Sequence, residues 1–238
     1  CGFCTATCPT YVLTGNELDS PRGRIYLFRD MLGSDRPPSE STVRHTDRCL
    51  SCLSCMTTCP ASVDYMHLVD EARNRIEKTY TRSFSDRLLR KLLTRVLPNP
   101  RIFRFALFFA RLGKPLADLM PERIRALLHL APAKIKAASN TGLPQIFRPE
   151  GKLKMRVALM TGCAQQVLRP SINEASIRLL TRHGCEVVIA NGAGCCGALA
   201  HHMGYENDAT ISAQANITAW YNSREEDGEL DAIVINTS

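Results

Sequence analysis

Two short runs of cysteines carry the most specific chemistry in this chain of 238 residues. One run has the spacing C-x2-C-x2-C-x3-C-P and consists of Cys49, Cys52, Cys55, Cys59 and Pro60. The other lacks only the leading cysteine of that pattern and consists of Cys1, Cys4, Cys8 and Pro9. Thiols spaced this tightly are poorly suited to a set of disulfides, so the pattern indicates thiolates that share a metal centre in a reducing compartment.

The complete run has the ligand spacing of bacterial ferredoxins with two [4Fe–4S] clusters, in which the fourth cysteine ligates the cluster of the other run. One predicted cluster is therefore bound by Cys8, Cys49, Cys52 and Cys55. The other is bound by Cys1, Cys4 and Cys59, with a fourth ligand expected three positions before Cys1. We accordingly interpret the chain as a fragment that is truncated at its N-terminus, and the apolar ending INTS indicates truncation at the C-terminus as well.

Zinc is the alternative metal, because pairs of C-x2-C also form zinc ribbons and fingers. A third cysteine at the same interval and the trailing Cys-Pro favour iron–sulfur clusters, and no histidine joins the runs. His45 and His67 lie near the cysteines in sequence, and we expect them to have structural roles, in capping or in hydrogen bonds to cluster sulfurs. If the metal were zinc, the chain would be a non-enzymatic module whose basic middle segment binds nucleic acid.

A second group of cysteines lies in the last third of the chain. Cys163 follows the apolar run VALM, and Cys195 and Cys196 follow the apolar run VVIA. Both positions are at the carboxyl ends of predicted parallel strands, where open α/β sheets place their ligands. We therefore predict a further iron–sulfur or zinc centre here, and we expect three nearby glycines to allow close backbone approach, namely Gly192, Gly194 and Gly197. Cys185 is interpreted as a core residue.

The elements that must position these cysteines fall into three predicted domains. Residues 1–81 form a small, mainly helical domain, in which Ser20 caps a helix that begins at Pro21 and extends to Leu32. The sequence SDRPPSEST predicts a linker. A second helix over residues 65–78 has an apolar stripe that consists of Met66, Val69, Ala72 and Ile76.

Residues 82–150 are predicted to be a basic helical linker that prolines divide into short helices. The only acidic residues between 81 and 137 are Asp86, Asp118 and Glu122. We expect this segment to contact a partner subunit or a membrane surface rather than nucleic acid. Residues 151–238 alternate strand, helix, strand, helix and strand, which predicts a parallel sheet with right-handed crossovers. The predicted fold class is α+β overall.

The bulk composition limits the other function classes. The chain has a formal net charge of +7, 45% hydrophobic residues and eleven cysteines, which fits a globular protein with a core. Its densest apolar run is FALFFA, which is too short to span a bilayer. We expect a cytoplasmic location, with peripheral contact to the inner face of the cell membrane as an option.

The chain resembles the iron–sulfur subunits of the glycolate oxidase family. The stretches that carry the resemblance are CGFCTATCPTYVLTGNELDSPRGRIYL, DRCLSCLSCMTTCP, VALMTGCAQ and GAGCCGALAHHMG. The resemblance implies that residues 151–238 are the first part of a cysteine-rich CCG domain. It also implies that the chain relays electrons toward a quinone or another acceptor. The source would be a partner subunit that uses FAD to oxidise glycolate to glyoxylate, so no catalytic residue is assigned here. Related lactate-utilisation, glycerol-3-phosphate dehydrogenase and heterodisulfide-reductase subunits are the alternatives.

Overall fold

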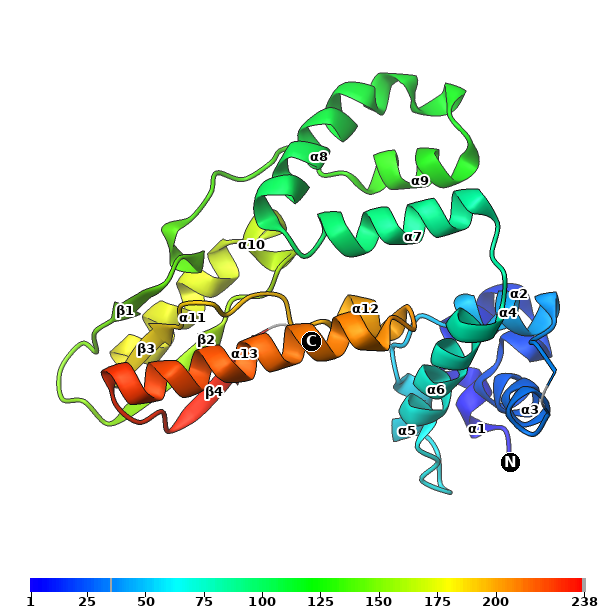
Figure 1. The fold of residues 1–238 in the computed structure, drawn as a ribbon, viewed down its shortest axis with the longest axis horizontal. Helices are drawn as coiled ribbons and strands as arrows, with labels where there is room; N and C mark the ends of the chain where they lie inside the picture. Colours follow the sequence, from blue (N-terminus) through cyan, green and yellow to red (C-terminus); the bar gives the residue numbers. More distant parts are fainter. Residues whose placement is uncertain (35, 237–238) are drawn as a thin grey trace. The chain divides into compact units, whose positions relative to one another are not determined.

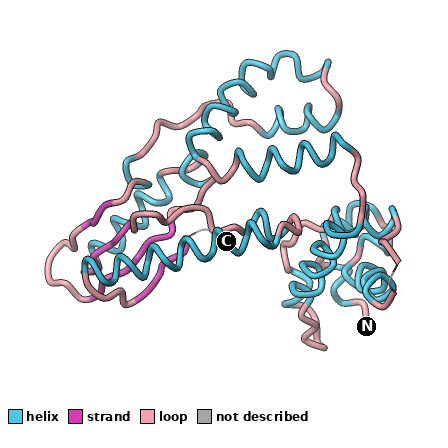
Figure 2. The backbone as a smooth tube through the Cα atoms, viewed as in Figure 1, coloured by secondary structure: helices cyan, strands magenta, loops and turns pink. Residues whose placement is uncertain are grey.

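The computed structural model describes residues 1–34 and 36–236, and the chain in it forms two compact units. The first unit consists of Cys1–Leu88 and Ala198–Ala209. The second consists of Leu89–Gly197 and the described residues that follow Ala209. Helices predominate, and the strands gather into one sheet in the second unit (Figures 1 and 2). The predicted α+β fold class is confirmed.

The first unit is a set of short helices around one apolar core. Its helices are α1 (Phe3–Ala6), α2 (Pro9–Thr14), η1 (Glu17–Asp19), α3 (Pro21–Leu32), α4 (Glu40–Asp47), α5 (Ser54–Thr57), α6 (Tyr65–Thr79) and α12 (Ala198–His202). The prediction for α3 is confirmed, because Pro21 is its first residue and the Ser20 hydroxyl accepts a hydrogen bond from the Gly23 backbone N–H. Capping of this kind satisfies an N–H that has no partner within the helix.

Helix α4 corrects the sequence prediction that residues 34–42 are a linker. The helix begins within that segment, where the Ser39 hydroxyl accepts a hydrogen bond from the Thr42 N–H. Two consecutive prolines before Ser39 suggested a turn, but they lie upstream of the cap and do not oppose the helix. Asp35, which belongs to the same predicted linker, lies outside the described residues.

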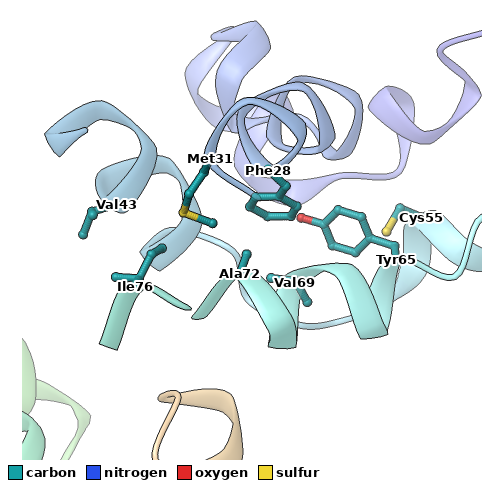
Figure 3. Packing of buried hydrophobic residues seen from close by; sticks show 8 residues of the cluster. All are labelled: Phe28, Met31, Val43, Cys55, Tyr65, Val69, Ala72 and Ile76. Atoms are coloured by element: carbon teal, nitrogen blue, oxygen red, sulfur yellow. The ribbon is translucent and has the colours of Figure 1, made fainter. Parts of the chain in front are cut away.

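The core of the first unit joins α3, α4, α5 and α6. Figure 3 shows its buried side chains, which are Phe28, Met31, Val43, Cys55, Tyr65, Val69, Ala72 and Ile76. The predicted stripe on α6 is confirmed for Val69, Ala72 and Ile76, whereas Met66 is only partly buried. Phe28 and Tyr65 pack with ring centroids 6.3 Å apart. The core thus holds the two longest helices of the unit together beside Cys55.

The second unit combines helices with a sheet. Its helices are α7 (Phe84–Val96), which begins in the first unit, α8 (Pro100–Gly113), η2 (Lys114–Leu119), α9 (Glu122–Leu130), η3 (Asn140–Gly142), α10 (Gln165–Leu168), α11 (Ser171–Arg182) and α13 (Glu206–Asp227), which also begins in the first unit. Prolines separate the helices as predicted, since Pro100 begins α8 and Pro121 caps α9. No helix among the described residues is both long and apolar enough to cross a membrane.

The sheet has the strand order β1-β3-β2-β4. Its strands are β1 (Gln145–Phe147), β2 (Met155–Met160), β3 (Cys185–Ile189) and β4 (Ala232–Ile235). The three predicted strands are present, and β2 pairs in parallel with both β3 and β4. The last two residues of the predicted third strand, 237 and 238, lie outside the described residues.

Strand β1 corrects the prediction of a purely parallel sheet and of a purely helical segment over residues 82–150. It pairs with β3 in the antiparallel direction, with Ile146 opposite Val188. A strand of three residues is too short to show the alternation by which a strand is identified from sequence. Its position is set by its partner β3, which is a contact between residues about forty positions apart.

Candidate metal centres

The first candidate centre is a cavity in the first unit that collects cysteines from both runs. Its lining includes four thiols, which belong to Cys8, Cys49, Cys52 and Cys55. These are the four residues expected to bind one cluster. Cys8 lies 41 positions before Cys49 in sequence, so only the fold brings it to the loop that carries the other three. Cys1, Cys4 and Cys59 do not line this cavity.

The thiolates that line the cavity are suited to binding a positively charged group. Burial, together with repulsion by the neighbouring thiolates of Cys49, Cys52 and Cys4, raises the pKa of the Cys55 thiol to about 11. Thiolates that repel one another in this way can all ionise only beside a positive centre. The irons of a [4Fe–4S] cluster supply that charge, so the donor set fits the group.

A buried network of charged and polar side chains fixes the position of Cys8. The Arg24 side chain is 1% exposed, and its Nη1 donates to the Cys8 sulfur at 3.8 Å while its Nε donates to the carbonyl oxygen of His45 at 2.7 Å. Asp19, which is fully buried, lies 3.6 Å from Arg24 Nη2 and 2.7 Å from His45 Nδ1. The Arg48 guanidinium lies 2.9 Å from the other oxygen of Asp19. Because every charge has a partner, the network can remain buried.

The same network keeps Cys8 ready to ionise. Burial by itself raises the pKa of Cys8, but hydrogen bonds from the Thr10 hydroxyl and the Tyr11 backbone N–H, together with the charge of Arg24, lower it below its usual value. His45 therefore acts structurally, as expected, although it bonds to Asp19 and to Arg24 rather than to a sulfur. His67 is exposed, with its Nε2 3.5 Å from Asp64, and its backbone N–H donates to the side chain of Asp64, which caps α6.

The other three cysteines of the runs lie nearer the surface. Cys1 is exposed, and Cys4 and Cys59 are half-buried. Backbone N–H groups of Val63, Ala61 and Ser62 lower the pKa of Cys59 below its usual value, since they donate to the sulfur. A thiolate stabilised by several backbone amides fits a metal ligand. That Cys1, Cys4 and Cys59 bind a second cluster stays a prediction.

The two runs are equivalent in backbone as well as in sequence. Gly2 and Leu53 occupy the same motif position, and each precedes a one-turn helix with a left-handed backbone, at φ 97° and 54°. Thr7 and Thr58, which each precede the last cysteine of their run, share a hydrogen bond of 3.2 Å between their hydroxyls. The pairing joins the two loops beside Cys8 and Cys59, as ligands exchanged between two clusters require.

Tyr65 is a further residue of the first centre that the sequence did not reveal. Its ring is buried in the core, and its hydroxyl donates to the Cys49 sulfur at 3.6 Å. Burial and the negative charge of Cys49 both raise the pKa of Tyr65, so the phenol remains a donor. Hydrogen bonds to the ligand sulfurs are one of the factors that set the potential of a cluster.

We expect Tyr65→Phe to lower the midpoint potential of the cluster that Cys49 binds. The hydrogen bond stabilises the more negative reduced state, so its loss favours the oxidised state. If the hydrogen bond stabilises the reduced cluster by about 1 kcal/mol more than the oxidised cluster, its loss shifts the midpoint potential by about 40 mV. Redox titration followed by electron paramagnetic resonance measures it, and Tyr80→Phe, which removes a hydroxyl at the edge of the same core, is the control. An unchanged potential would mean that Tyr65 only fills space.

The second candidate centre lies in the second unit, at the carboxyl ends of β2 and β3. The sulfurs of Cys163 and Cys195 lie 3.7 Å apart, and the Gly197 N–H donates to Cys195 at 3.4 Å. Cys196 is exposed. The structure thus brings together Cys163 and Cys195, from sites 32 residues apart, as the predicted strand order requires. Cys185 packs against the core of the sheet, in agreement with its prediction.

Two glycines at this site have a backbone conformation that favours glycine. Gly192 and Gly197 have φ values of 86° and 84°, which other residues rarely adopt. A Cβ atom on Gly194 would meet nothing within 4 Å, and close approach of these glycines to a bound group stays a prediction. The loop is held by Asn216, whose side chain accepts from the Gly194 N–H and donates to the Cys195 carbonyl oxygen.

We expect Cys163 to be the most readily ionised thiol of this pair. The hydrogen bond from Cys195 lowers the pKa of Cys163 to about 6, and the same bond raises the pKa of Cys195. In metal-free protein, alkylation of Cys163 should therefore rise with pH through about pH 6 and level off near neutrality. Cys195→Ala removes the donor and should move this midpoint upward. Peptide mapping after timed alkylation measures both, and equal profiles in the two proteins would contradict the assignment.

The residues that sequence analysis missed are mostly polar residues that are buried by contacts with distant segments. Arg24 and Asp19 belong to stretches that read as exposed, and Tyr65 is the first residue of a helix. The only local signal was Gly23, a glycine in a helix, which can indicate close packing.

The comparisons with known proteins match a domain to each of the two cysteine-bearing parts of the chain. Residues 1–63 match the 4Fe-4S dicluster domain, and residues 157–237 match the cysteine-rich domain called CCG. The chain is 42% identical to the glycolate oxidase iron-sulfur subunit of Escherichia coli (strain K12) over 93% of this chain and 51% of that protein. It is 32% identical to the probable glycolate oxidase iron-sulfur subunit of Bacillus subtilis (strain 168) over 99% of this chain and 55% of that protein.

Other similarities are more local. Lactate utilization protein A of Bacillus subtilis (strain 168) is 33% identical over 29% of each chain. No solved structure matches the chain. The chain spans about half the length of the two curated relatives that it matches throughout.

Proposed function

The chain belongs to the family of glycolate oxidase iron–sulfur subunits, and from this premise we propose that it relays electrons from glycolate oxidation through two [4Fe–4S] clusters. The observation that carries the proposal is the cavity in which Cys8 from one run meets Cys49, Cys52 and Cys55 from the other. A cluster bound there would take up one electron at a time and pass it on. This chain's residues would bind the cluster and set its potential.

We further propose that the donor is a separate subunit that holds FAD and oxidises glycolate to glyoxylate, and that the final acceptor is a quinone or a similar compound. The resemblance to glycolate oxidase subunits along nearly the whole chain supports this substrate. Neither candidate centre contains an acid–base pair suited to hydride removal from a hydroxy acid. Oxidation of the substrate is therefore assigned to the partner.

The helices between residues 84 and 130 supply the surface that we propose for partner contact. Exposed apolar side chains gather on α8, where they are Ile102, Phe105, Phe108, Phe109 and Leu112. Two basic residues, Arg104 and Arg111, lie between them in the sequence. A surface of this composition suits a partner subunit, or an anionic membrane as the other option. Co-elution with the flavin subunit, compared with sedimentation on anionic vesicles, separates the two.

The decisive experiment is reduction of the clusters by substrate in the reassembled complex. Full-length protein and its flavin partner are mixed without oxygen, and the visible absorption of the clusters is followed after glycolate, lactate or glycerol 3-phosphate is added. We expect glycolate to bleach the clusters at the highest rate, with dithionite as the control for complete reduction. Faster bleaching by lactate or glycerol 3-phosphate would reassign the substrate. Bound zinc in place of iron and sulfide would overturn electron transfer altogether.

A further inference from the structure

A third group of metal-ligating side chains lies in the first unit, apart from the cysteines. It consists of Asp70 on α6 and of His201 and His202 on α12. His201 Nε2 lies 3.1 Å from Asp70 Oδ2, and His202 Nδ1 lies 3.2 Å from Asp70 Oδ1. Each residue offers one ligand atom within 4.8 Å of the other two. Both α6 and this part of the chain after Gly197 belong to the same compact unit.

The surroundings of His201 require a positive charge between it and Asp70. Its Nδ1 lies 2.8 Å from Glu206 Oε2, while its Nε2 faces Asp70, so both ring nitrogens face carboxylate oxygens. A neutral imidazole can donate only one hydrogen bond, so its other nitrogen would direct a lone pair at a carboxylate. Either a second proton or a metal ion meets this requirement.

The site is built on rigid elements. Asp70 is buried on the inner side of α6, whereas His201 and His202 are about 40% exposed and open to solvent. Gly204, just after α12, has a φ of 82°, and a Cβ atom there would lie 2.6 Å from the carbonyl oxygen of Arg73. A glycine is therefore needed for α12 to approach α6 this closely. The close contact holds both imidazoles over Asp70.

Arg73 forms only a long ion pair with Asp70. Its Nη1 lies 4.0 Å from Asp70 Oδ1, which is beyond hydrogen-bond distance. Its guanidinium donates instead to the Ser51 hydroxyl and to the carbonyl oxygen of Cys49. Asp70 therefore has both oxygens directed at the two imidazoles.

We propose that Asp70, His201 and His202 bind one divalent transition-metal ion, for which Zn²⁺ has the matching ligand preference. Two imidazoles and one carboxylate, with an open position for water, form a known three-ligand zinc set. In a tetrahedral zinc site the ligand atoms stand about 3.3 Å apart. Here His201 Nε2 and His202 Nδ1 lie 3.1 and 3.2 Å from different oxygens of Asp70, and one ligand atom of each residue lies within 4.8 Å of the other two. Glu206 would act as a positioning residue, because a carboxylate on Nδ1 fixes the tautomer that presents Nε2 to the metal. The site does not depend on the proposed electron transfer.

The test is zinc binding by the full-length protein with its clusters assembled. Protein is equilibrated with buffered micromolar Zn²⁺ and analysed for zinc and iron. We expect about one zinc per chain that is lost in both His201→Ala and His202→Ala, with iron unchanged. His183→Ala, which removes an exposed histidine of the second unit, should keep its zinc. Glu206→Gln should weaken zinc binding by about tenfold to a hundredfold, as the loss of a hydrogen-bond partner of a metal ligand does.

X-ray absorption at the zinc edge separates this site from the cysteines. A zinc with nitrogen and oxygen neighbours that is lost in both histidine variants would support the proposal, and any zinc held by Cys163, Cys195 and Cys196 would show sulfur neighbours and remain. Zinc with sulfur neighbours only, a zinc content that is the same with and without the histidines, or protein that retains no zinc would each overturn it. Unchanged iron in the variants also shows that the unit has folded, so a loss of zinc cannot be assigned to misfolding.

Discussion

Cys8→Ser should damage the cluster bound by Cys49, Cys52 and Cys55, and it should spare the cluster served by the other cysteines of its own run. The reason is that Cys8 lines the cavity of the second run, and Arg24 and Thr10 hold its sulfur there. With three thiolates left, the cluster should be lost or should degrade to a [3Fe–4S] form. Iron analysis should then show a loss of between about one quarter and all of one cluster. Electron paramagnetic resonance identifies the species that remains.

Cys59→Ser is the matched variant, because Cys59 occupies the same motif position in the second run. It should damage the cluster assigned to Cys1 and Cys4 and spare the cluster that Cys49, Cys52 and Cys55 bind. Cys185→Ser is the control for a cysteine outside both runs, since it packs in the core of the sheet. If each substitution instead damaged the cluster of its own run, the crossed arrangement would be wrong.

Gly23→Ala should strongly destabilise the first unit. A Cβ atom at this position would lie 2.0 Å from the carbonyl oxygen of Glu17 and 2.9 Å from the Cα of Leu18. Both atoms belong to the backbone of η1, so no side-chain rotation can relieve the clash. Alanine gains about 1 kcal/mol of helix propensity, but the overlap should cost more, and we expect a net loss of about 3 kcal/mol. For a unit of this size the melting temperature should fall by on the order of 10 °C.

The same clash should also destabilise the first metal centre. Helix η1 carries Asp19, which holds His45 and Arg48 and lies next to Arg24. A displaced η1 would loosen the network behind Cys8, so the cluster should be lost sooner on heating. Circular dichroism and visible absorption, recorded in one temperature scan, measure both effects. Gly113→Ala is the control, because a Cβ atom there would meet a side-chain atom of Leu128 at 3.7 Å, an ordinary contact distance. Equal melting of the two variants would contradict this explanation.

The features that the sequence determined are those set within a few residues. The spacing of Cys49, Cys52 and Cys55 places three thiols on one loop whatever the rest of the chain does. The start of α3 follows from Ser20 and Pro21, because a cap and a fixed φ act locally. The parallel strands β2, β3 and β4 follow from apolar runs separated by helical periods. Such patterns are visible because the side-chain period of an element is a property of the element itself.

The features that only the tertiary structure decided depend on residues far apart in the chain. Strand β1 exists as a strand because β3 lies beside it, and its own three residues carry no periodic signal. Asp19 and Arg24 are of residue types that are mostly exposed, yet both are buried because they pair with each other and each forms a hydrogen bond with His45. The hydrogen bond from Tyr65 to Cys49 likewise depends on how α6 packs against the cysteine loop.

The group of Asp70, His201 and His202 shows most clearly which sites cannot be predicted from the sequence alone. Asp70 is separated from the two histidines by 131 and 132 positions, and each residue taken alone reads as part of a polar helix face. Their meeting depends on Gly204, which allows α12 to contact the backbone of α6. Chain spacing determines which ligands share a loop, whereas the packing of helices determines which ligands from different segments share a site.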